Sequence, residues 1–276
     1  MATVAQPAFE TGPRRPDVFS GTPRAHAVDR WIYVFTAASF IVICLAGFIP
    51  DSLMKIADVE AGRRPPFPMV LHAHAVLMGG FLVLLLGQTW MMATGRKALH
   101  MKLGVLGAIM AVALIIVGFM LVYTNYHMLY GATQSADPKV SEGAAIGLNI
   151  WENIMLLQIR IGLLFGLFLG IGIAARNRDA GLHKRMVILA TAMALPAGID
   201  RIPWIPHTMP LSPLSPDLYT LLAVSPMLVW DVVRNGYLHK AWVIWFGVTI
   251  PCAVLVNLLW DTPGWHSAVK QLMGVA

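Results

Sequence analysis

The chain has 276 residues, of which 57% are hydrophobic and only 12% are charged, and its mean hydropathy is +0.67. Soluble domains carry about 25% charged residues, so this composition excludes an ordinary soluble protein and predicts a chain embedded in lipid. The formal net charge is +6, but no basic stripe interleaved with aromatic residues accompanies it, so we expect no nucleic-acid partner. Cys44 and Cys252 lie inside apolar segments and predict neither a disulfide framework nor a CxxC site.

Residues 1–30 contain four prolines and few apolar side chains, which predicts a flexible cytoplasmic tail. The first apolar run begins at Trp31, and no A-x-A cleavage site follows it, so we interpret this run as an uncleaved membrane anchor. His26 in this tail and His266 near the other end of the chain are both expected to be exposed to solvent.

Seven stretches approach the ~20 apolar residues that a membrane-spanning helix needs. We therefore predict an all-α, multi-pass membrane bundle with seven transmembrane helices between residues 31 and 262, followed by a short tail at 263–276. Pro196 and Pro226 are expected to kink the fifth and sixth helices, because neighbouring helices can satisfy the carbonyl groups that proline frees. The predicted spans are 31–50, 68–94, 101–124, 150–175, 184–202, 217–234 and 240–260.

Lys and Arg are distributed unevenly between the two sets of predicted connections. With the N-terminus inside, thirteen fall on the inner side and six on the outer side, and Arg160 lies within the fourth helix. Cytoplasmic loops carry the excess of positive charge, so we predict an N-in, C-out orientation; an even number of helices would return the C-terminus to the inside. The six outer residues are Lys55, Arg63, Arg64, Lys139, Arg201 and Lys270.

Three histidines recur in one context, in which a glycine and a Leu-His pair stand at the start of a long apolar segment. They are His100, His183 and His239, and the predicted orientation places them at the inner ends of the third, fifth and seventh helices. Ionisable groups in membrane segments commonly have a functional role, and imidazole is a frequent ligand of metals and of haem iron. The alternative is that Gly, His and Lys simply suit a turn at the membrane interface.

A second set of polar residues is expected near the outer face. His72 and His74 lie in the second helix, and the stretch from Asp200 to Met209, which includes His207, follows the fifth. This stretch is interpreted either as a lid or quinone site formed with His72 and His74, or as an ordinary interfacial turn with Trp204 in the aromatic belt.

Arg160 is the least favourable residue in the predicted bundle. It lies about 16 Å into the fourth helix by helical rise, and a charge at that depth costs on the order of 3 kcal/mol. It therefore needs a partner, which we expect to be Asp200, Asp231 or an acidic cofactor group such as a haem propionate. Asp231 is alternatively a structural partner for a nearby Arg or Lys.

Several motifs together carry a resemblance to known proteins. They are Leu-His-Ala-His-Ala, Gly-Arg-Lys-Ala-Leu-His100, Leu-His183-Lys-Arg-Met, Ala-Gly-Ile-Asp200-Arg201 and the Trp-Asp231 segment that leads to His239. Over roughly residues 68–250 the chain resembles a group of bacterial integral-membrane proteins without a settled function. More coarsely, it is similar to the small transmembrane cytochromes b, in which pairs of histidines on neighbouring helices hold one haem near each leaflet.

This resemblance implies specific ligand pairs. His100 with His183 would hold an inner haem b, and His74 or His72 with His207 or His127 would hold an outer one. His239 is a third inner histidine that a bis-histidine haem does not need. It leaves open a copper or zinc site formed by His100, His183 and His239.

The leading functional prediction is a haem b electron-transfer protein of the bacterial inner membrane that exchanges electrons with quinol and a respiratory-chain protein. A second hypothesis is an assembly factor that handles haem or copper for a respiratory oxidase, since the 16 methionines suit copper. The remaining alternatives are a small transporter, with Arg160, Gln88 and Glu152 lining a polar path, and a structural subunit of a membrane complex. The sequence predicts no catalytic residue.

Overall fold

The computed structural model describes residues 27–275, and every regular element within them is an α-helix. Residues 1–26 of the predicted tail, with His26, lie outside the described residues. The last four residues assigned to that tail already belong to the first helix, α2, which begins at Ala27. The prediction of an all-α protein is confirmed for the described part of the chain.

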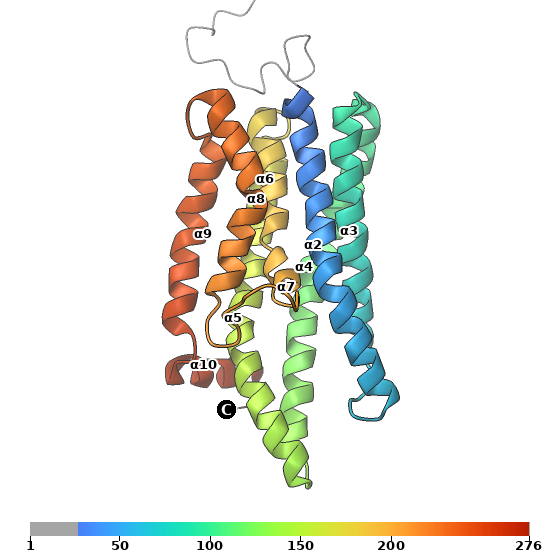
Figure 1. The fold of residues 1–276 in the computed structure, drawn as a ribbon, viewed down its shortest axis with the longest axis vertical. Coiled ribbons are helices and arrows are strands. Elements are labelled where there is room, and N and C mark those ends of the chain that lie inside the picture. The colour runs from blue at the N-terminus through green and yellow to red at the C-terminus, as the bar shows by residue number, and fades with distance from the viewer. Residues whose placement is uncertain (1–26, 276) are drawn as a thin grey trace, which may run out of the picture.

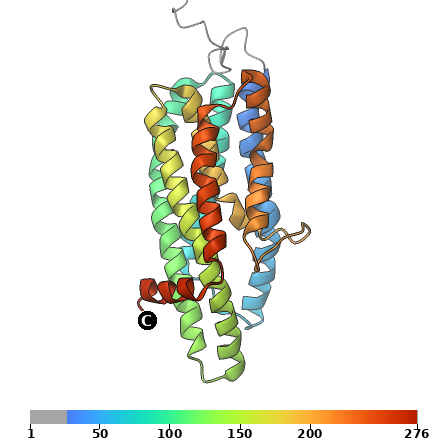
Figure 2. The same ribbon diagram turned by 90° about the vertical axis from the view of Figure 1, so that its left-hand side faces the viewer.

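Six helices within residues 27–275 are long and apolar enough to cross a membrane. They lie side by side as an elongated bundle (Figures 1 and 2), and their exposed sides carry large apolar residues such as Val42, Val83 and Val105. An apolar exterior of this extent is typical of a lipid-facing surface, so the chain is a multi-pass membrane protein. The six helices are α2 (Ala27–Glu60), α3 (Met69–Ala93), α4 (Lys97–Thr133), α5 (Pro138–Ala175), α8 (Leu214–Asn235) and α9 (Lys240–Leu259).

The fifth predicted span differs from the others because it is broken into two short helices. These are α6 (Ala180–Ala192) and α7 (Leu195–Ile199), with Pro196 in the first turn of α7. Proline has no backbone N–H to continue the ladder of the preceding helix but is favourable in the first turn of a new one. Pro196 therefore ends one helix and starts another, whereas Pro226 is accommodated inside α8.

Helix α7 approaches α2 very closely, and the contact depends on two glycines. A Cβ atom built at Gly47 would lie only 2.0 Å from the carbonyl oxygen of Gly198, and a Cβ at Gly198 would lie 3.3 Å from the Cα of Cys44. Any larger side chain at Gly47 would force the two backbones apart. The GxxxG repeat of α5 also serves packing, since a Cβ at Gly162 would lie 2.8 Å from the ring of Phe119 on α4.

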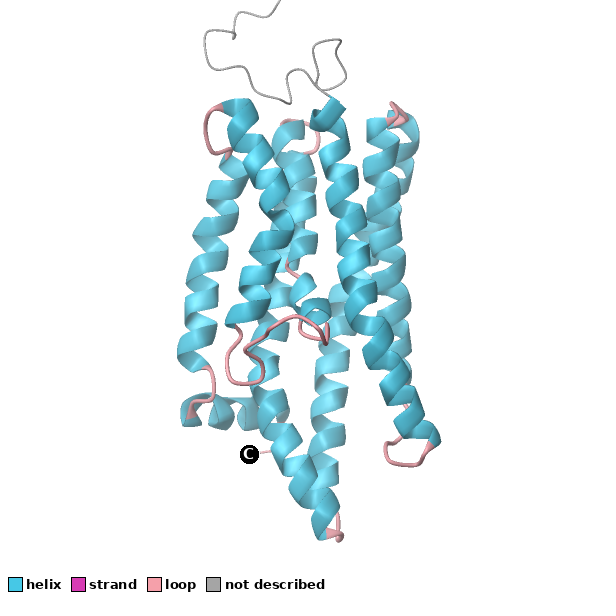
Figure 3. Ribbon diagram, in the orientation of Figure 1, coloured by secondary structure: helices cyan, strands magenta, loops and turns pink. Residues whose placement is uncertain are grey.

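The beginning of α2 and three short turns lie at one end of the bundle, which is the upper end in Figure 1 (see also Figure 3). The turns join α3 to α4, α5 to α6 and α8 to α9. The first and third contain glycines with left-handed backbone, Gly95 at φ 78° and Gly236 at φ 72°, a conformation that suits glycine at a helix C-terminus. Because His100, His183 and His239 each lie in the first turn of the following helix or directly before it, their predicted location at one end is confirmed.

The opposite, lower end carries a short helix that the sequence did not reveal. Helix α10 (Pro263–Met273) lies below α9 and against α5, above the lower tips of α4 and α5 (Figures 1 and 2). The Thr262 side chain accepts a hydrogen bond from the backbone of Trp265. His266, predicted to be exposed, instead packs against α5 with 16% of its side chain exposed. Helix α4 has 37 residues, or about 55 Å by rise, so it extends well beyond a hydrocarbon core of about 30 Å.

Candidate functional site

His100 and His183 face each other at the upper end of the bundle. His100 lies in the first turn of α4 and His183 in the first turn of α6, and their ring centroids are 6.3 Å apart with an angle of 76° between the ring planes. Both side chains are half-buried. The structure thus brings together the two residues predicted as the inner haem ligands.

His183 is held by a contact that fixes its ring. Its Nδ1 lies 2.8 Å from the carbonyl oxygen of Gly172 on α5, and because a carbonyl only accepts, Nδ1 carries the proton. The other ring nitrogen, Nε2, keeps its lone pair, as in histidines that bind a metal. A Cβ at Gly172 would lie 3.2 Å from the Cβ of Met186, so the glycine allows α5 and α6 to approach closely enough for this contact.

His100 is oriented by Gln88 of α3, whose amide faces the ring. With its NH₂ group turned toward α4, Gln88 donates to Nδ1 and to the carbonyl oxygen of His100 (3.1 Å), and its oxygen accepts from the backbone of Gly104 at 3.1 Å. Because Nδ1 then accepts, a neutral His100 carries its proton on Nε2, and binding of a metal through Nε2 would require the Gln88 amide to turn so that its oxygen accepts from Nδ1. The amide of Gln88 therefore sets the tautomer of His100.

The spacing of the two rings fits a shared metal centre. An imidazole nitrogen binds a metal at about 2.0–2.1 Å, so two imidazoles on opposite sides of one metal have ring centres ~6 Å apart, close to the 6.3 Å between His100 and His183. Gly104 follows His100 by one turn on the same face, and a Cβ there would meet no atom within 4 Å. This open position leaves space beside the imidazole for the edge of a larger group.

His239, the third histidine at this end, caps the helix that follows it. It is 1% exposed and caps α9, where its Nδ1 accepts a hydrogen bond from the backbone of Ala241 at 3.1 Å. Residues 27–275 contain no group of three or more His, Cys, Asp and Glu side chains placed to hold a metal. The three-histidine arrangement is therefore not found in this part of the chain.

Asp179 and Lys240 link the starts of α6 and α9, the helices that carry His183 and follow His239. Asp179 caps α6 by accepting from the backbone of Leu182 and forms an ion pair with Lys240. Partial burial favours the neutral carboxyl, but the hydrogen bonds from Lys240 and Leu182 outweigh it and hold the pKa of Asp179 below its usual value. These contacts fix the turns around the histidine pair.

The predicted outer ligands are not brought together in the same way. His74 lies opposite Gly118 of α4, where a Cβ would be 3.8 Å from the His74 ring. His127 is nine residues further along α4, or about 13.5 Å by rise. His72 and His207 are both exposed, His72 at the start of α3 and His207 in the loop after α7.

Arg160 has the partner that its depth requires, but not one of those predicted. Its side chain is 3% exposed and forms two hydrogen bonds with the carboxylate of Asp217 in the first turn of α8, one of them of 2.9 Å between Nη1 and Oδ2. The guanidinium is therefore neutralised without a cofactor carboxylate. The two residues are 57 positions apart in sequence, and no periodicity links them.

Asp231 forms a fully buried network with Arg185, which was counted among the basic residues of the inner flanks. Arg185 Nε donates to Asp231 Oδ2 at 2.6 Å, and its Nη2 donates to Oδ1 at 2.7 Å. The indole N–H of Trp242 donates to the same carboxylate at 2.7 Å. The prediction of Asp231 as a structural partner is confirmed, and the network joins α6, α8 and α9.

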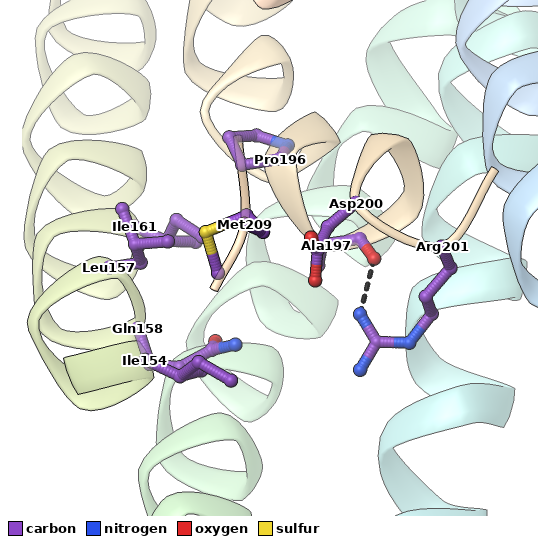
Figure 4. Close-up of a pocket in the computed structure, with 9 residues that line it drawn as sticks. All are labelled: Ile154, Leu157, Gln158, Ile161, Pro196, Ala197, Asp200, Arg201 and Met209. Carbon is purple, nitrogen blue, oxygen red and sulfur yellow. Dashed lines mark hydrogen bonds between the residues drawn. The ribbon is translucent and has the colours of Figure 1, made fainter. Parts of the chain in front are cut away.

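A small cavity lies beside the loop that was predicted as a lid. Asp200 and Met209 face residues of α5 across it, and Arg201 at its edge donates to the carbonyl oxygen of Ala197 (Figure 4). Its accessible volume is about 20 Å³, room for on the order of one water molecule. Trp204 is 66% exposed, as expected of an aromatic residue at the membrane interface.

Comparison of the chain with protein-family models, with curated proteins and with solved structures found no match. The site is therefore interpreted from its own residues.

Proposed function

We propose that the chain is a membrane-embedded haem b protein that transfers electrons, with His100 and His183 as the two axial ligands of one haem. The observation that supports this most is the 6.3 Å separation of the two rings, which come from α4 and α6. This separation is close to the ~6 Å expected for two imidazoles on one metal, whereas a simple interface turn does not require the two rings to be near each other. Their equivalent positions in two helices match the pattern of a bis-histidine site.

The side chains around the pair suit this role. The carbonyl oxygen of Gly172 on α5 accepts from Nδ1 of His183, which leaves Nε2 available as a ligand. The amide of Gln88 on α3 contacts the ring and the carbonyl oxygen of His100. Both rings are half-buried at the end of the bundle, a position that would allow electron exchange with a partner outside the membrane. When bound, the haem supplies the one-electron chemistry.

We also propose the topology and cellular location that the charge pattern favours. Together α6 and α7 extend over residues 180–199, or about 30 Å by rise, which is long enough for a seventh crossing. The basic residues flanking the upper turns, among them Arg96, Lys97 and Arg176, favour the cytoplasmic side of a bacterial inner membrane for this end. The histidine pair would then lie near the inner leaflet, with quinol and a respiratory-chain protein as its redox partners.

Copper handling is the second candidate, and one observation favours it. Two facing imidazoles without a third ligand also suit copper, for which imidazole is a common ligand. Zinc in proteins is almost always bound by four ligands or by three and a water, so the same pair suits zinc less well. An assembly factor for a respiratory oxidase would contain copper and no haem.

The test is to quantify haem, copper and zinc per chain in the purified protein and in three variants. We expect one haem per chain in the wild type, with equal losses in His100→Ala and His183→Ala. His207→Ala is the matched control, because that histidine is exposed, and it should retain the haem. A wild-type protein with copper and no haem would favour the second candidate, and full haem content in both ligand variants would exclude this pair.

A further inference from the structure

A chain of polar side chains at the lower end of the bundle leads from a buried glutamate to solvent. Glu152 of α5 is 4% exposed, and its Oε2 lies 2.5 Å from Nδ1 of His266 on α10. The other ring nitrogen of His266 lies 3.2 Å from Oδ1 of Asp261, whose side chain is 64% exposed. On the inner side, the hydroxyl of Tyr126, a residue that is 0% exposed, donates to Oε1 of Glu152 at 3.4 Å.

This cluster is separate from the histidine pair. Tyr126 follows His100 by 26 residues in the same helix, which corresponds to ~39 Å along α4. That distance exceeds a hydrocarbon core of about 30 Å, so the cluster lies near the opposite boundary of the membrane. Its chemistry therefore does not depend on a cofactor at the upper end.

Because Glu152 is buried, its carboxylate needs a partner, and His266 is that partner. An isolated carboxylate in a buried position is strongly unfavourable and is tolerated when it is paired or protonated. His266 compensates the carboxylate when both of its ring nitrogens carry protons, and this pair keeps the same net charge when the Nδ1 proton moves to Glu152. A proton can move between the two groups without leaving a net charge uncompensated.

Asp261 is held in position by an unusual backbone conformation. It has φ 56°, the only positive φ among non-glycine residues in the described part of the chain, and such strain persists where the surroundings enforce it, commonly at functional sites. Asn153, 5% exposed, provides this enforcement: it donates to Asp261 Oδ1 at 3.1 Å and accepts from the Asp261 backbone at 2.9 Å. The hydrogen bond from Asn153, and that from His266 when its Nε2 carries a proton, hold the pKa of Asp261 below its usual value.

We propose that Glu152, His266 and Asp261 form a proton-exchange path between solvent and the buried lower end of the bundle. A solvent proton taken up by Asp261 passes to Nε2 of a neutral His266 whose Nδ1 already carries a proton, which gives an imidazolium beside the Glu152 carboxylate. The Nδ1 proton then passes to Oε2 of Glu152. One proton is transferred in total, and His266 ends as the other neutral tautomer, which returns to the first by ring rotation or by the reverse transfer.

The other groups around the path fit this assignment. Asn149 of α5 lies 3.5 Å from Nε2 of His266, is neutral and does not compete for the proton. Lys270 is one turn further along α10 and carries the nearest positive charge on that helix. The titratable groups that face His266 are thus Glu152 on one side and Asp261 on the other, with Tyr126 facing Glu152 from α4.

The experiment is infrared spectroscopy of the full-length protein in lipid bilayers, in which the C=O stretch of protonated carboxyl groups is followed as the pH is changed. We expect a titrating band that is present in the wild type and lost in Glu152→Gln. Glu142→Gln is the matched control, because Glu142 is an exposed glutamate of the same helix, and it should leave the band unchanged. A spectrum of Glu152→Gln identical to that of the wild type would overturn the proposal.

A second variant separates proton exchange from a purely structural role for His266. His266→Gln can keep hydrogen bonds to both carboxylates but cannot relay a proton. We expect hydrogen–deuterium exchange of the carboxyl band to slow by about 100-fold, the low end of what a positioned acid–base group contributes. If the exchange rate is unchanged, His266 only fastens α10 to the bundle. Neither measurement requires haem, so its outcome is independent of the proposed function.

Discussion

The buried pair of Arg185 and Asp231 gives the strongest prediction about stability. Arg185 is 0% exposed and Asp231 is 2% exposed, and the carboxylate also accepts from Trp242. Asp231→Asn removes the negative charge but keeps the shape, so the buried guanidinium loses the carboxylate charge that its Nε and Nη2 contact. Breaking a buried pair in this way costs about 3–5 kcal/mol. At roughly 2–4 °C per kcal/mol for a protein of this size, the melting temperature should fall by about 6–20 °C.

The assay is thermal unfolding of the detergent-purified protein, followed by tryptophan fluorescence. Asp58→Asn is the control, since Asp58 pairs with Arg63 at the surface, where such a pair contributes about 0–1 kcal/mol. The double variant Arg185→Met with Asp231→Leu should recover much of the loss, because neither charge remains buried. Equal melting temperatures for Asp231→Asn and Asp58→Asn would refute this reasoning.

Three further predictions concern packing, charge and pH. Gly47→Ala should destabilise the protein by about 3 kcal/mol or more, because its Cβ would meet a carbonyl oxygen at 2.0 Å, whereas Gly131→Ala, with no atom within 4 Å, should be neutral or stabilising by up to about 1 kcal/mol in thermal unfolding. Arg160→Leu should cost about 3 kcal/mol by leaving Asp217 without its partner, and adding Asp217→Leu should restore part of the folded yield in size-exclusion chromatography. Because the pKa of Asp261 is lowered in the folded protein, its contribution to stability is present above the ordinary aspartate value of about 3.9 and lost as the pH falls through the folded value. The melting temperature of the wild type should therefore fall more steeply below about pH 4 than that of Asp261→Asn; parallel curves would contradict this assignment.

The long helices could be predicted from hydropathy alone, because a span of about 20 apolar residues leaves few alternatives. The fifth span was harder, since its interruption depends on where Pro196 falls relative to the close contact between Gly47 and Gly198. That contact joins α2 to α7, and no local pattern in either segment indicates it. Helix α10 is too short and too polar to stand out from a tail.

The histidine pair could be predicted because His100 and His183 occur in equivalent contexts at two helix starts. The partner of Arg160 could not, because Asp217 lies on a helix that meets α5 only in the folded bundle. His266 was misassigned for a related reason: its place in the predicted C-terminal tail suggested exposure, whereas its contact with Glu152 depends on how α10 packs against α5. Local patterns identified residues able to carry chemistry, but their partners depended on long-range packing.

The central claim is that His100 and His183 hold one haem between α4 and α6. The most direct test is a reduced-minus-oxidised absorption spectrum of the purified wild-type protein beside that of His183→Ala. The account predicts a sharp b-type haem signal in the wild type, which His183→Ala abolishes while the protein remains folded. A wild-type spectrum without a haem signal, or a signal that persists unchanged in His183→Ala, would contradict it.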